Sequence, residues 1–429
     1  PPACGFSRPN SALGTRCWTL PLALIKPPTE RDAWHVRFNK ARTAAYLNTF
    51  APNLEVLCTD HTGLHNALGH NAYQTPALDG APWYRQTNPD TAEFLGLFPG
   101  TIDGDEDSTR QVDVTELSGD GGIQSLARHG SKEIRVRGVL FATTERGLTA
   151  GMTWLRNTLD DSPCGQNNML NCEGRELRFF SVSPGAPTEA EAIQLVADYG
   201  RVMYRVEPLD GPRKVLKKPY KTVVGQEIEF ILNAGVPWAF TFPEPVATTT
   251  NVTPVTTAET YCPTQMDSYD ALVVDPQAPS VTRPPRPPQI ESVAMPTSWS
   301  RYTMTIGSTY GQRAGRLVPL LTITTGTTAK RQLRVRFYRT GNSGACDYEG
   351  EFYISYIPAN SVLTIDGTTK ETVVRVGGVD KPAGNLVLGS NGRPARWPSM
   401  ACDSSYQVVV DSVGGLSGTS VLTEVSIRE

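Results

Sequence analysis

The 429-residue sequence has neither a long hydrophobic run nor a strong excess of charge of one sign. A membrane-spanning helix needs about 20 consecutive, mostly apolar residues, and no run of about 18 occurs, so we predict no membrane span. The formal net charge is −3, which gives no global electrostatic attraction to nucleic acid. We therefore predict no nucleic-acid specificity and no membrane-embedded segment.

The sequence also lacks the common catalytic motifs. It contains no Gly-x-Ser-x-Gly, no His-Glu-x-x-His and no phosphate-binding loop. No pair of carboxylates lies in a helix or strand context that would tune the two pKa values apart. We therefore predict that the chain is not an enzyme, that it has no catalytic residues and that it uses no cofactor.

The cysteines are scattered along the chain. None of the eight forms a Cys-x-x-Cys pair, which argues against a zinc ribbon, a redox motif and a dense disulfide scaffold. Cysteine is among the most buried residue types, so we expect buried free thiols. Cys164 and Cys172 bracket a short polar loop and are the pair that could form a bridge. The eight positions are Cys4, Cys17, Cys58, Cys164, Cys172, Cys262, Cys346 and Cys402.

Three histidines lie within ten residues of each other. His61 and His65 are one helical turn apart, the separation at which two imidazoles can share a metal, and His70 follows them. Gly63 and Gly69 would interrupt a helix here, and His70 would need a chain reversal to converge with the other two. A polar surface loop or an interface cluster is the preferred interpretation, and we predict no metal site.

The most regular pattern in the chain runs from Glu116 to Asp161. Its first part, Glu133–Phe141, places Ile134, Val136 and Leu140 at even spacing, which predicts a half-buried strand. Its second part predicts an amphipathic helix that Ser162–Pro163 ends. The apolar stripe of that helix is Leu148, Met152, Leu155 and Leu159.

Three further strands are predicted after this helix, at Glu176–Ser183, Gly200–Glu207 and Gln226–Leu232. They supply a sheet for the helix stripe to cover. The last strand continues into Ala234-Gly235-Val236-Pro237-Trp238. The basic run Arg213–Lys221 has Tyr220 as its one aromatic residue, so we expect a solvated hairpin rather than a nucleic-acid patch.

The order of these elements resembles the hub domain of siphophage distal tail proteins and related minor tail proteins. The residues that carry the resemblance are a Gly119-Asp120-Gly121-Gly122 turn, the arginine-bearing strand, the helix across the sheet, and the final strand before Pro237 and Trp238. The stretch Val139–Leu159 is particularly similar to minor tail proteins of actinobacterial phages. The chain departs from the family where Ala234 to Trp238 replaces the usual Asp-Pro. The resemblance implies that these turn, stripe and Pro-Trp residues shape a hub that forms rings.

Thr/Pro-rich segments separate this region from the C-terminal part of the chain. Residues 244–260 and 275–288 lack the apolar content to pack a core, and RPPRPP favours extended polyproline. The predicted organisation is an irregular or β segment at residues 1–110 that is part of the hub or inserted in it, a hub core at 111–245, a linker at 246–289 and a β-sandwich at 290–429. The fold class is mainly β, with one packed α-helix in the hub.

The C-terminal part contains many short alternating strands, which is typical of a β-sandwich. Asp366–Gly367 predicts a hairpin turn between two of them. This hairpin also resembles the galectin-like outer domain of distal tail proteins, and the residues that match are Thr368, Thr369 and Lys370. The predicted strands are 332–339, 351–357, 361–366, 371–376, 405–411 and 420–427.

One loop of the predicted sandwich could contact a ligand. Its residues Asn391, Arg393, Arg396 and Trp397 combine an aromatic ring with hydrogen-bonding groups, which suits a sugar or a protein partner. Alternatively, Trp397 plugs the end of the sandwich.

Two classes of function follow. The resemblance implies a structural protein of the bacteriophage tail tip, assembled in the host cytoplasm and located in the virion, that forms a ring, hexameric by expectation, between tail tube and baseplate. Its partners would be other copies of itself, the tail tube protein, the tape measure and other tail-tip proteins. The alternative is a host-receptor or carbohydrate-binding tail protein that contacts cell-wall glycan through its C-terminal β-sandwich.

Overall fold

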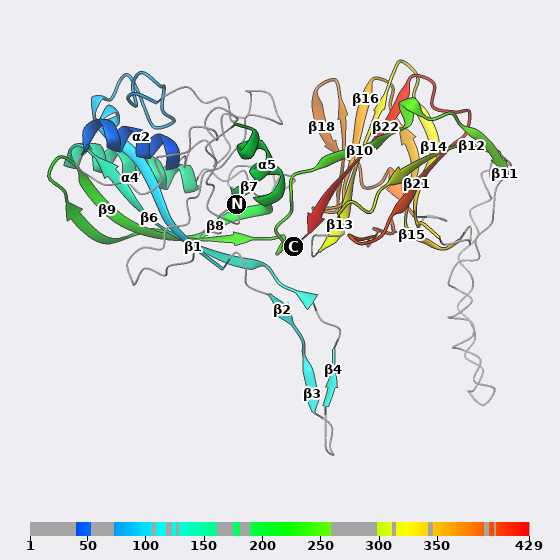
Figure 1. The fold of residues 1–429 in the computed structure, drawn as a ribbon, viewed down its shortest axis with the longest axis horizontal. Coiled ribbons are helices and arrows are strands. Elements are labelled where there is room, and N and C mark those ends of the chain that lie inside the picture. The colour runs from blue at the N-terminus through cyan, green and yellow to red at the C-terminus, as the bar shows by residue number, and fades with distance from the viewer. Residues whose placement is uncertain are drawn as a thin grey trace, which may run out of the picture. The chain divides into compact units, whose positions relative to one another are not determined.

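The computed structural model describes residues 40–52, 73–104, 109–116, 122–125, 128–160, 175–180, 189–258, 298–310, 315–341, 346–389, 394–398 and 400–428. The chain divides into two compact units, Pro1–Phe242 and Pro243–Glu429. Strands predominate over helices in the described residues, so the predicted mainly β class is confirmed (Figure 1).

The N-terminal unit is built on a five-stranded antiparallel sheet. Its order is β1 (Phe94–Asp103), β6 (Lys132–Ala142), β9 (Val224–Ala234), β8 (Gly200–Pro219) and β7 (Arg175–Phe180). In β6 the alternation seen in the sequence is realised, since Ile134, Val136 and Leu140 are buried and Arg135 and Arg137 are exposed.

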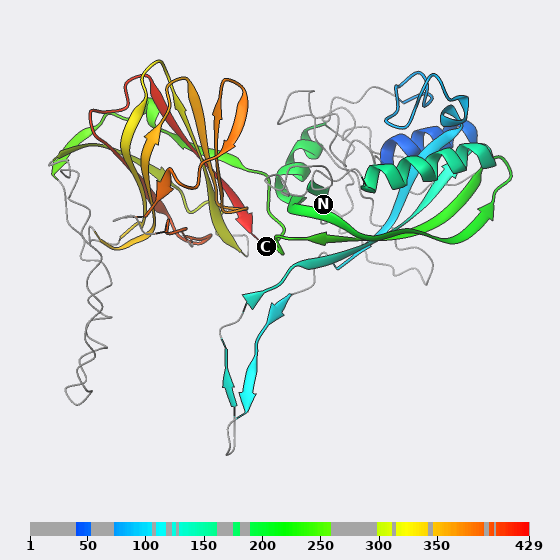
Figure 2. The same ribbon diagram turned by 180° about the vertical axis from the view of Figure 1, so that it is seen from behind.

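Helices cover one face of this sheet, as Figures 1 and 2 show from opposite sides. The helix α4 (Glu145–Asp160) crosses β1, β6, β9 and β8, while α2 (Lys40–Phe50) packs on β1. The predicted stripe faces the sheet, because all four of its residues are buried: Leu148, Met152, Leu155 and Leu159. Two short helices, η1 (Pro89–Ala92) and α5 (Glu189–Tyr199), complete the described helices of this unit.

The contact between α4 and β1 is unusually close. A Cβ atom added at Gly151 would overlap the ring of Phe94, and one added at Gly147 would lie 2.7 Å from Cβ of Glu93. The backbone of α4 at Gly147 and Gly151 therefore lies directly against the start of β1, and larger side chains at these two positions would prevent this contact.

The face of the sheet opposite α4 carries charge. Arg135 and Arg137 on β6 each lie 3.2 Å from a carboxylate oxygen of Glu229 on β9. The β8–β9 hairpin extends beyond the pairing of β8 with β7, and the basic run at 213–221 lies on this exposed extension, together with Leu209, Val215 and Leu216.

The C-terminal unit is a β-sandwich with its core between two sheets. One sheet has the order β10 (Glu244–Thr248), β22 (Thr419–Arg428), β13 (Arg316–Thr325), β16 (Ser361–Asp366), β17 (Glu371–Val376) and β18 (Val379–Pro382), with β20 (Met400–Ala401) also on β13. The other has the order β11 (Val255–Ala258), β12 (Ser298–Ile306), β21 (Tyr406–Ser412), β14 (Lys330–Arg339), β15 (Tyr348–Ile357) and β19 (Val387–Leu388).

The hairpin predicted at Asp366–Gly367 joins β16 to β17. The Asp366 carboxylate accepts hydrogen bonds from the backbone N–H (2.7 Å) and the hydroxyl (2.6 Å) of Thr368, and Lys370 adopts a φ of 58°. An aspartate that bonds to the backbone two residues later stabilises such a turn.

Several elements differ from the sequence-based expectations. The strands β10 and β11 lie inside the stretch predicted as a linker, because its Thr and Val residues have high strand propensity and pair with β22 and β12. The helix α2 and the strand β1 lie in the stretch predicted as irregular or β, and β1 forms one edge of the N-terminal sheet. Among the described residues, no helix is both long and apolar enough to cross a bilayer.

The cysteines behave differently from one another. Cys402 is a buried thiol, as expected. Cys346, in contrast, is disulfide-bonded, so the expectation of free thiols is wrong for this residue. The loop with Cys164 and Cys172 lies outside the described residues.

Candidate functional site

A long two-stranded hairpin, described at residues 104, 109–116, 122–125 and 128–131, projects from the end of the β1–β6 pair (Figures 1 and 2). We call it the arm. It continues the antiparallel pairing through β2 (Arg110–Gln111) with β5 (Arg128–His129), and then β3 (Val114–Glu116) with β4 (Gly122–Gln124). The arm is two strands wide along its described length and belongs to no larger sheet.

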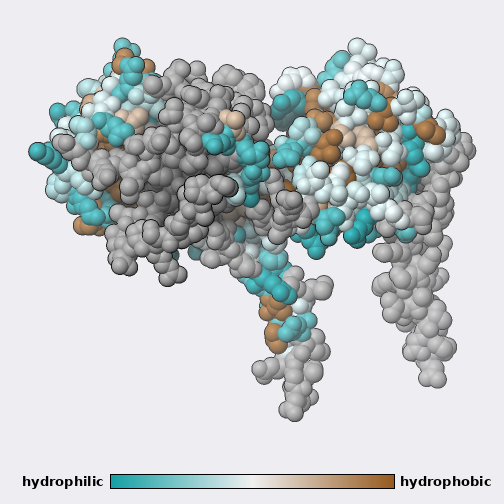
Figure 3. All heavy atoms as spheres, in the orientation of Figure 1, coloured by the Kyte–Doolittle hydropathy of each residue, from teal (hydrophilic) through white to brown (hydrophobic). Residues whose placement is uncertain are grey.

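The described arm residues have no core of their own. None of those whose burial is described is buried, and Val114 is 59% exposed. Figure 3 shows hydrophobic residues among the hydrophilic ones along the arm. Its strands are joined by backbone contacts such as Ser125 N–H to Asp113 O (2.8 Å) and Gly130 N–H to Thr109 O (3.2 Å). An isolated two-stranded hairpin is marginally stable at best in water, so the arm gains little stability from its own side chains.

The predicted hub residues fall at this arm as well as on the helix. Gly122 begins β4, while Gly119, Asp120 and Gly121 lie outside the described residues. Trp238 packs on His129 of β5 with ring centroids 4.3 Å apart, at the root of the arm. Pro237 precedes it and is half-buried. The predicted Pro-Trp pair therefore lies where the arm leaves the unit.

A buried charge cluster lies on the outer face of the β12–β21–β14 sheet. The Asp411 side chain on β21 is fully buried, and Arg301 on β12 donates to both of its oxygens, from Nε at 2.7 Å and from Nη2 at 3.0 Å. From β14, the Nη2 atoms of Arg334 and Arg336 each donate to Oδ2 at 2.9 Å. One carboxylate thus joins three neighbouring strands.

The electrostatics of this cluster favour the charged carboxylate. Burial is the largest influence on the pKa of Asp411 and raises it, but the hydrogen bonds and charges of Arg301 and Arg334 outweigh burial and leave the pKa below its usual value. The hydrogen bond to Asp411 likewise raises the pKa of Arg301. Aromatic rings cover the guanidinium groups, with Arg334 4.7 Å from the ring centroid of Trp299 and Arg336 5.5 Å from that of Tyr338.

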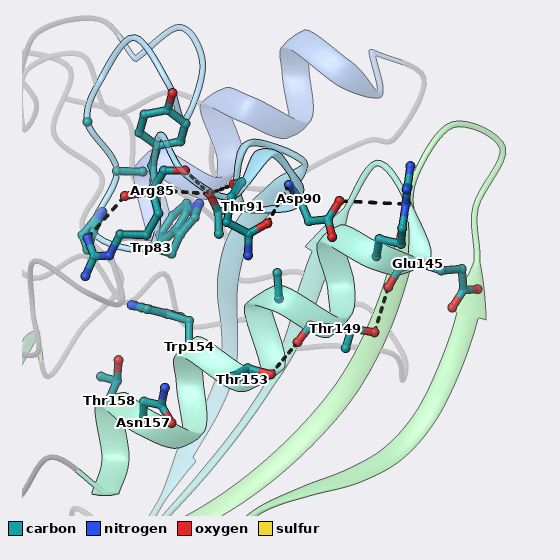
Figure 4. Close-up of a pocket in the computed structure, with 17 residues that line it drawn as sticks. Trp83, Arg85, Asp90, Thr91, Glu145, Thr149, Thr153, Trp154, Asn157 and Thr158 are labelled. Atoms are coloured by element: carbon teal, nitrogen blue, oxygen red, sulfur yellow. Dashed lines mark hydrogen bonds and ion pairs between the residues drawn. The ribbon is translucent and has the colours of Figure 1, made fainter.

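A groove of about 1150 Å³ lies between the outward face of α4 and the loop of residues 80–91 (Figure 4). Thr149, Thr153 and Asn157 follow one another along α4 at one helical turn, and Trp154 projects from the same helix beside Trp83. No sequence pattern indicates this groove, because the polar face of α4 has the composition of an ordinary solvent-exposed helix face.

The loop wall of the groove is held by hydrogen bonds. Thr91 Oγ1 accepts from the backbone N–H of Arg85 (2.9 Å) and lies 2.6 Å from the carbonyl oxygen of Asn88, to which it donates. The buried Trp83 donates from its indole nitrogen to the carbonyl oxygen of Phe94 (2.8 Å).

The predicted contact loop of the sandwich is only partly described. Asn391 and Arg393 lie outside the described residues. Arg396 pairs its backbone with Glu351 and lies over the ring of Tyr348 at 5.6 Å. Trp397 packs edge-on against the core residue Phe352, with ring centroids 5.0 Å apart, which is the plugging arrangement considered above.

No metal site emerges from the described part of the chain. There, no group of three or more His, Cys, Asp or Glu side chains is arranged to hold an ion. The histidines considered in the sequence, His61, His65 and His70, lie outside the described residues.

Comparisons with known proteins return phage structures at low identity. The SPP1 Dit (gp 19.1) protein, described as a paradigm of hub adsorption apparatus in Gram-positive infecting phages, is 10% identical over 79% of this chain and 95% of its own, with a TM-score of 0.35. The phage P2 baseplate in its activated conformation with Ca is 8% identical over 78% of this chain and 91% of that one, with a TM-score of 0.37. Its counterpart with Sr is 8% identical over 77% and 90%, with a TM-score of 0.36.

No protein-family model and no curated protein matches the chain. Because the TM-scores lie below 0.5 and the identities at or below 10%, these likenesses do not assign the chain to a family.

Proposed function

We propose that this chain is a structural component of a siphovirus tail tip, of the distal tail protein type, that forms a hexameric ring between the tail tube and the baseplate. Its partners in this role are further copies of itself, the tail tube protein, the tape measure and other tail-tip proteins. The C-terminal sandwich is then the galectin-like outer domain. The role is one of assembly, without catalysis.

The order of elements in the N-terminal unit supports this proposal. The strand 132–142, the helix 145–160 and the strands 175–180, 200–219 and 224–234 follow one another as the resemblance to hub domains implies. The helix stripe covers the sheet, and Trp238 lies at the root of the arm.

The observation that carries the proposal is the arm. Apart from the ring contact of His129 with Trp238 at its root, the arm residues whose burial is described are exposed or half-buried, and hydrophobic side chains such as Val114 lie on its surface. Such a hairpin gains a partner surface when it lies on the next copy of the chain. A contact of this kind joins unlike surfaces of identical subunits, and repeated with rotation it closes into a ring.

The test is to remove the arm while keeping the sheet. A variant in which residues 105–130 are replaced by an Asn-Gly turn joins β1 to β6 directly, because two-residue Asn-Gly loops suit antiparallel strands. We expect the full chain to form closed rings in mass photometry and negative-stain electron microscopy, and the armless variant to remain monomeric with an unchanged circular dichroism spectrum.

The control alters a hairpin turn elsewhere without changing its length. Replacing Gly377–Gly378, which lie between β17 and β18, with Asn-Gly alters an exposed turn of the other unit and should leave the rings intact. A full chain that stays monomeric at all concentrations, or an armless variant that still forms rings, would refute the proposal.

The receptor-binding alternative has less support from the described geometry. Of the residues predicted to contact glycan, Trp397 is packed against Phe352 and the Arg396 side chain lies over Tyr348. Neither arrangement leaves an aromatic face from that loop fully open to a sugar.

A further inference from the structure

We propose that the groove between α4 and the loop of residues 80–91 binds a neutral saccharide. This inference is independent of the tail-tip proposal, since it concerns the outward face of the helix, and the ring would rest on the arm. It also differs from the glycan contact considered for the sandwich, which involves the other unit of the chain.

The groove offers an aromatic platform that is held in place. The Trp154 indole is partly exposed, and it packs against Trp83 at a centroid distance of 5.3 Å and against Phe94 at 5.9 Å. Trp83 is itself fixed by its hydrogen bond to the backbone of β1. A rigid aromatic side chain provides apolar contact area at low entropic cost, which suits the C–H face of a sugar ring.

Polar groups suited to sugar hydroxyls flank this platform. The Asn157 side chain is exposed and makes no hydrogen bond among the described residues, so its amide offers both donors and an acceptor. Thr149 and Thr153 donate their hydroxyl hydrogens to carbonyl oxygens one turn earlier in α4, at 3.0 Å each. Their oxygens therefore present acceptor lone pairs toward the groove, which hydroxyl donors of a saccharide can use.

The charges of the groove indicate a neutral ligand. Arg85 and Arg146 line it together with Asp90 and Glu145, so two positive and two negative side chains cancel. Arg146 lies 3.9 Å from Asp90, and Glu145 is paired with Lys217. A phosphorylated or strongly anionic ligand would find no excess of positive charge here.

The apolar content of the groove disfavours a protein partner. None of the exposed large hydrophobic side chains among the described residues lines it. The centre of a protein interface is instead rich in large buried apolar anchors. A hollow with one aromatic platform and several convergent polar groups is the arrangement of a small-ligand site.

The experiment measures binding of neutral oligosaccharides to the full chain. A panel of chito-, malto-, cello- and galacto-oligosaccharides is screened by saturation-transfer-difference NMR, and each hit is titrated by calorimetry. We expect at least one hit at millimolar concentration or below. Because one hydrogen bond contributes about 1 kcal/mol, Asn157→Ala should weaken that affinity roughly fivefold, and Trp154→Phe should weaken it further by shrinking the platform.

Two variants locate the site. Arg156→Ala changes an exposed residue of the same helix that does not line the groove, and should leave affinity unchanged. Trp397→Ala alters the other unit and should also leave it unchanged. The proposal is overturned if no oligosaccharide of the panel binds, if Asn157→Ala and Trp154→Phe bind as well as the unaltered chain, or if Trp397→Ala alone abolishes binding. It is also overturned if Asn157→Ala changes the mass of the assembly while no sugar binds, since the groove is then a contact between proteins.

Discussion

Replacing Asp411 with asparagine would leave the guanidinium groups of Arg301, Arg334 and Arg336 around a neutral amide. In the native cluster the two oxygens of Asp411 accept from all three arginines, and the Asp411 side chain has no solvent-exposed surface. The substitution keeps the shape but removes the charge, and it introduces an N–H donor that faces other donors. Breaking a buried ion pair on one side costs about 3–5 kcal/mol, because the remaining charges stay buried without compensation.

The chain contains a control at the surface, in which one arginine pairs with both oxygens of an aspartate as Arg301 does with Asp411. Arg375 donates from Nε and Nη2 to the two oxygens of Asp380 at 2.7 Å each, but the side chains are 61% and 50% exposed. Asp380→Asn should therefore cost about 1 kcal/mol or less, because water solvates the charges that are left. Asp411 is buried and also accepts from Arg334 and Arg336, so the difference between the two variants measures burial together with these additional bonds.

The assay is urea unfolding of the full chain followed by hydrogen-exchange mass spectrometry, which reports on β12, β14 and β21 separately from the N-terminal unit. A domain is typically stable by about 5–15 kcal/mol, so the expected loss for Asp411→Asn is a large fraction of the total. If Asp411→Asn and Asp380→Asn lower the free energy of unfolding by the same amount, the argument from burial is wrong.

The contribution of Asp411 to stability depends on pH in a definite direction. The folded pKa of Asp411 lies below its unfolded value of about 3.9, so its contribution to stability is fully present above that pH. The contribution is lost as the pH falls through the folded pKa. The difference in stability between the native chain and Asp411→Asn should therefore be constant from neutral pH to about pH 5 and shrink below about pH 4. A difference that grows on acidification would contradict this assignment.

Two predictions concern the N-terminal unit. Gly151→Ala should destabilise it by about 1–3 kcal/mol through overlap with Phe94, although alanine is the better helix former. The control Thr153→Ala, on the exposed side of α4, should leave stability unchanged. Thermal unfolding of both variants measures the difference. Leu155→Ala should lower the free energy of unfolding by about 2–5 kcal/mol because the side chain is fully buried. Leu209→Ala should lower it far less, because Leu209 is 57% exposed. Equal losses of unfolding free energy in urea titrations would contradict the packing of α4.

Elements with strong periodicity could be predicted from the sequence. The apolar stripe of α4 repeats with the period of a helix, and the apolar residues of β6 alternate with the period of a strand. Each pattern therefore predicts both the kind of secondary structure and the face that is buried. In contrast, β1 has the sequence FLGLFPGTID, in which two glycines and a proline disfavour the prediction of a strand. The structure accommodates them through two register shifts in the pairing of β1 with β6. The residues of α2 carry no clear amphipathic period, so the sequence does not predict that helix either.

The candidate sites were harder to foresee because they depend on contacts distant in the sequence. Arg334 and Arg336 are visible as alternating residues of a strand, but their carboxylate partner lies 77 and 75 residues further along the chain. The arm was visible only as a Gly-rich turn, since the length of a hairpin depends on pairing between both flanks. The groove requires the loop of residues 80–91 to meet α4, which no local pattern encodes.

The position of β22 in the sandwich determines when the C-terminal unit can fold during translation. This strand comes last among those of its unit, yet it lies between β10, the first, and β13. Val421 also donates its backbone N–H to Thr249 at 2.9 Å, across 172 residues. The sheet therefore cannot close until residues up to Arg428 have been synthesised, whereas the strands of the N-terminal unit are all available by Ala234. During translation the first unit can fold while the second still lacks the strand that joins β10 to β13. A ribosome that stalls within residues 419–428 leaves an exposed sheet edge for chaperones and proteases to recognise.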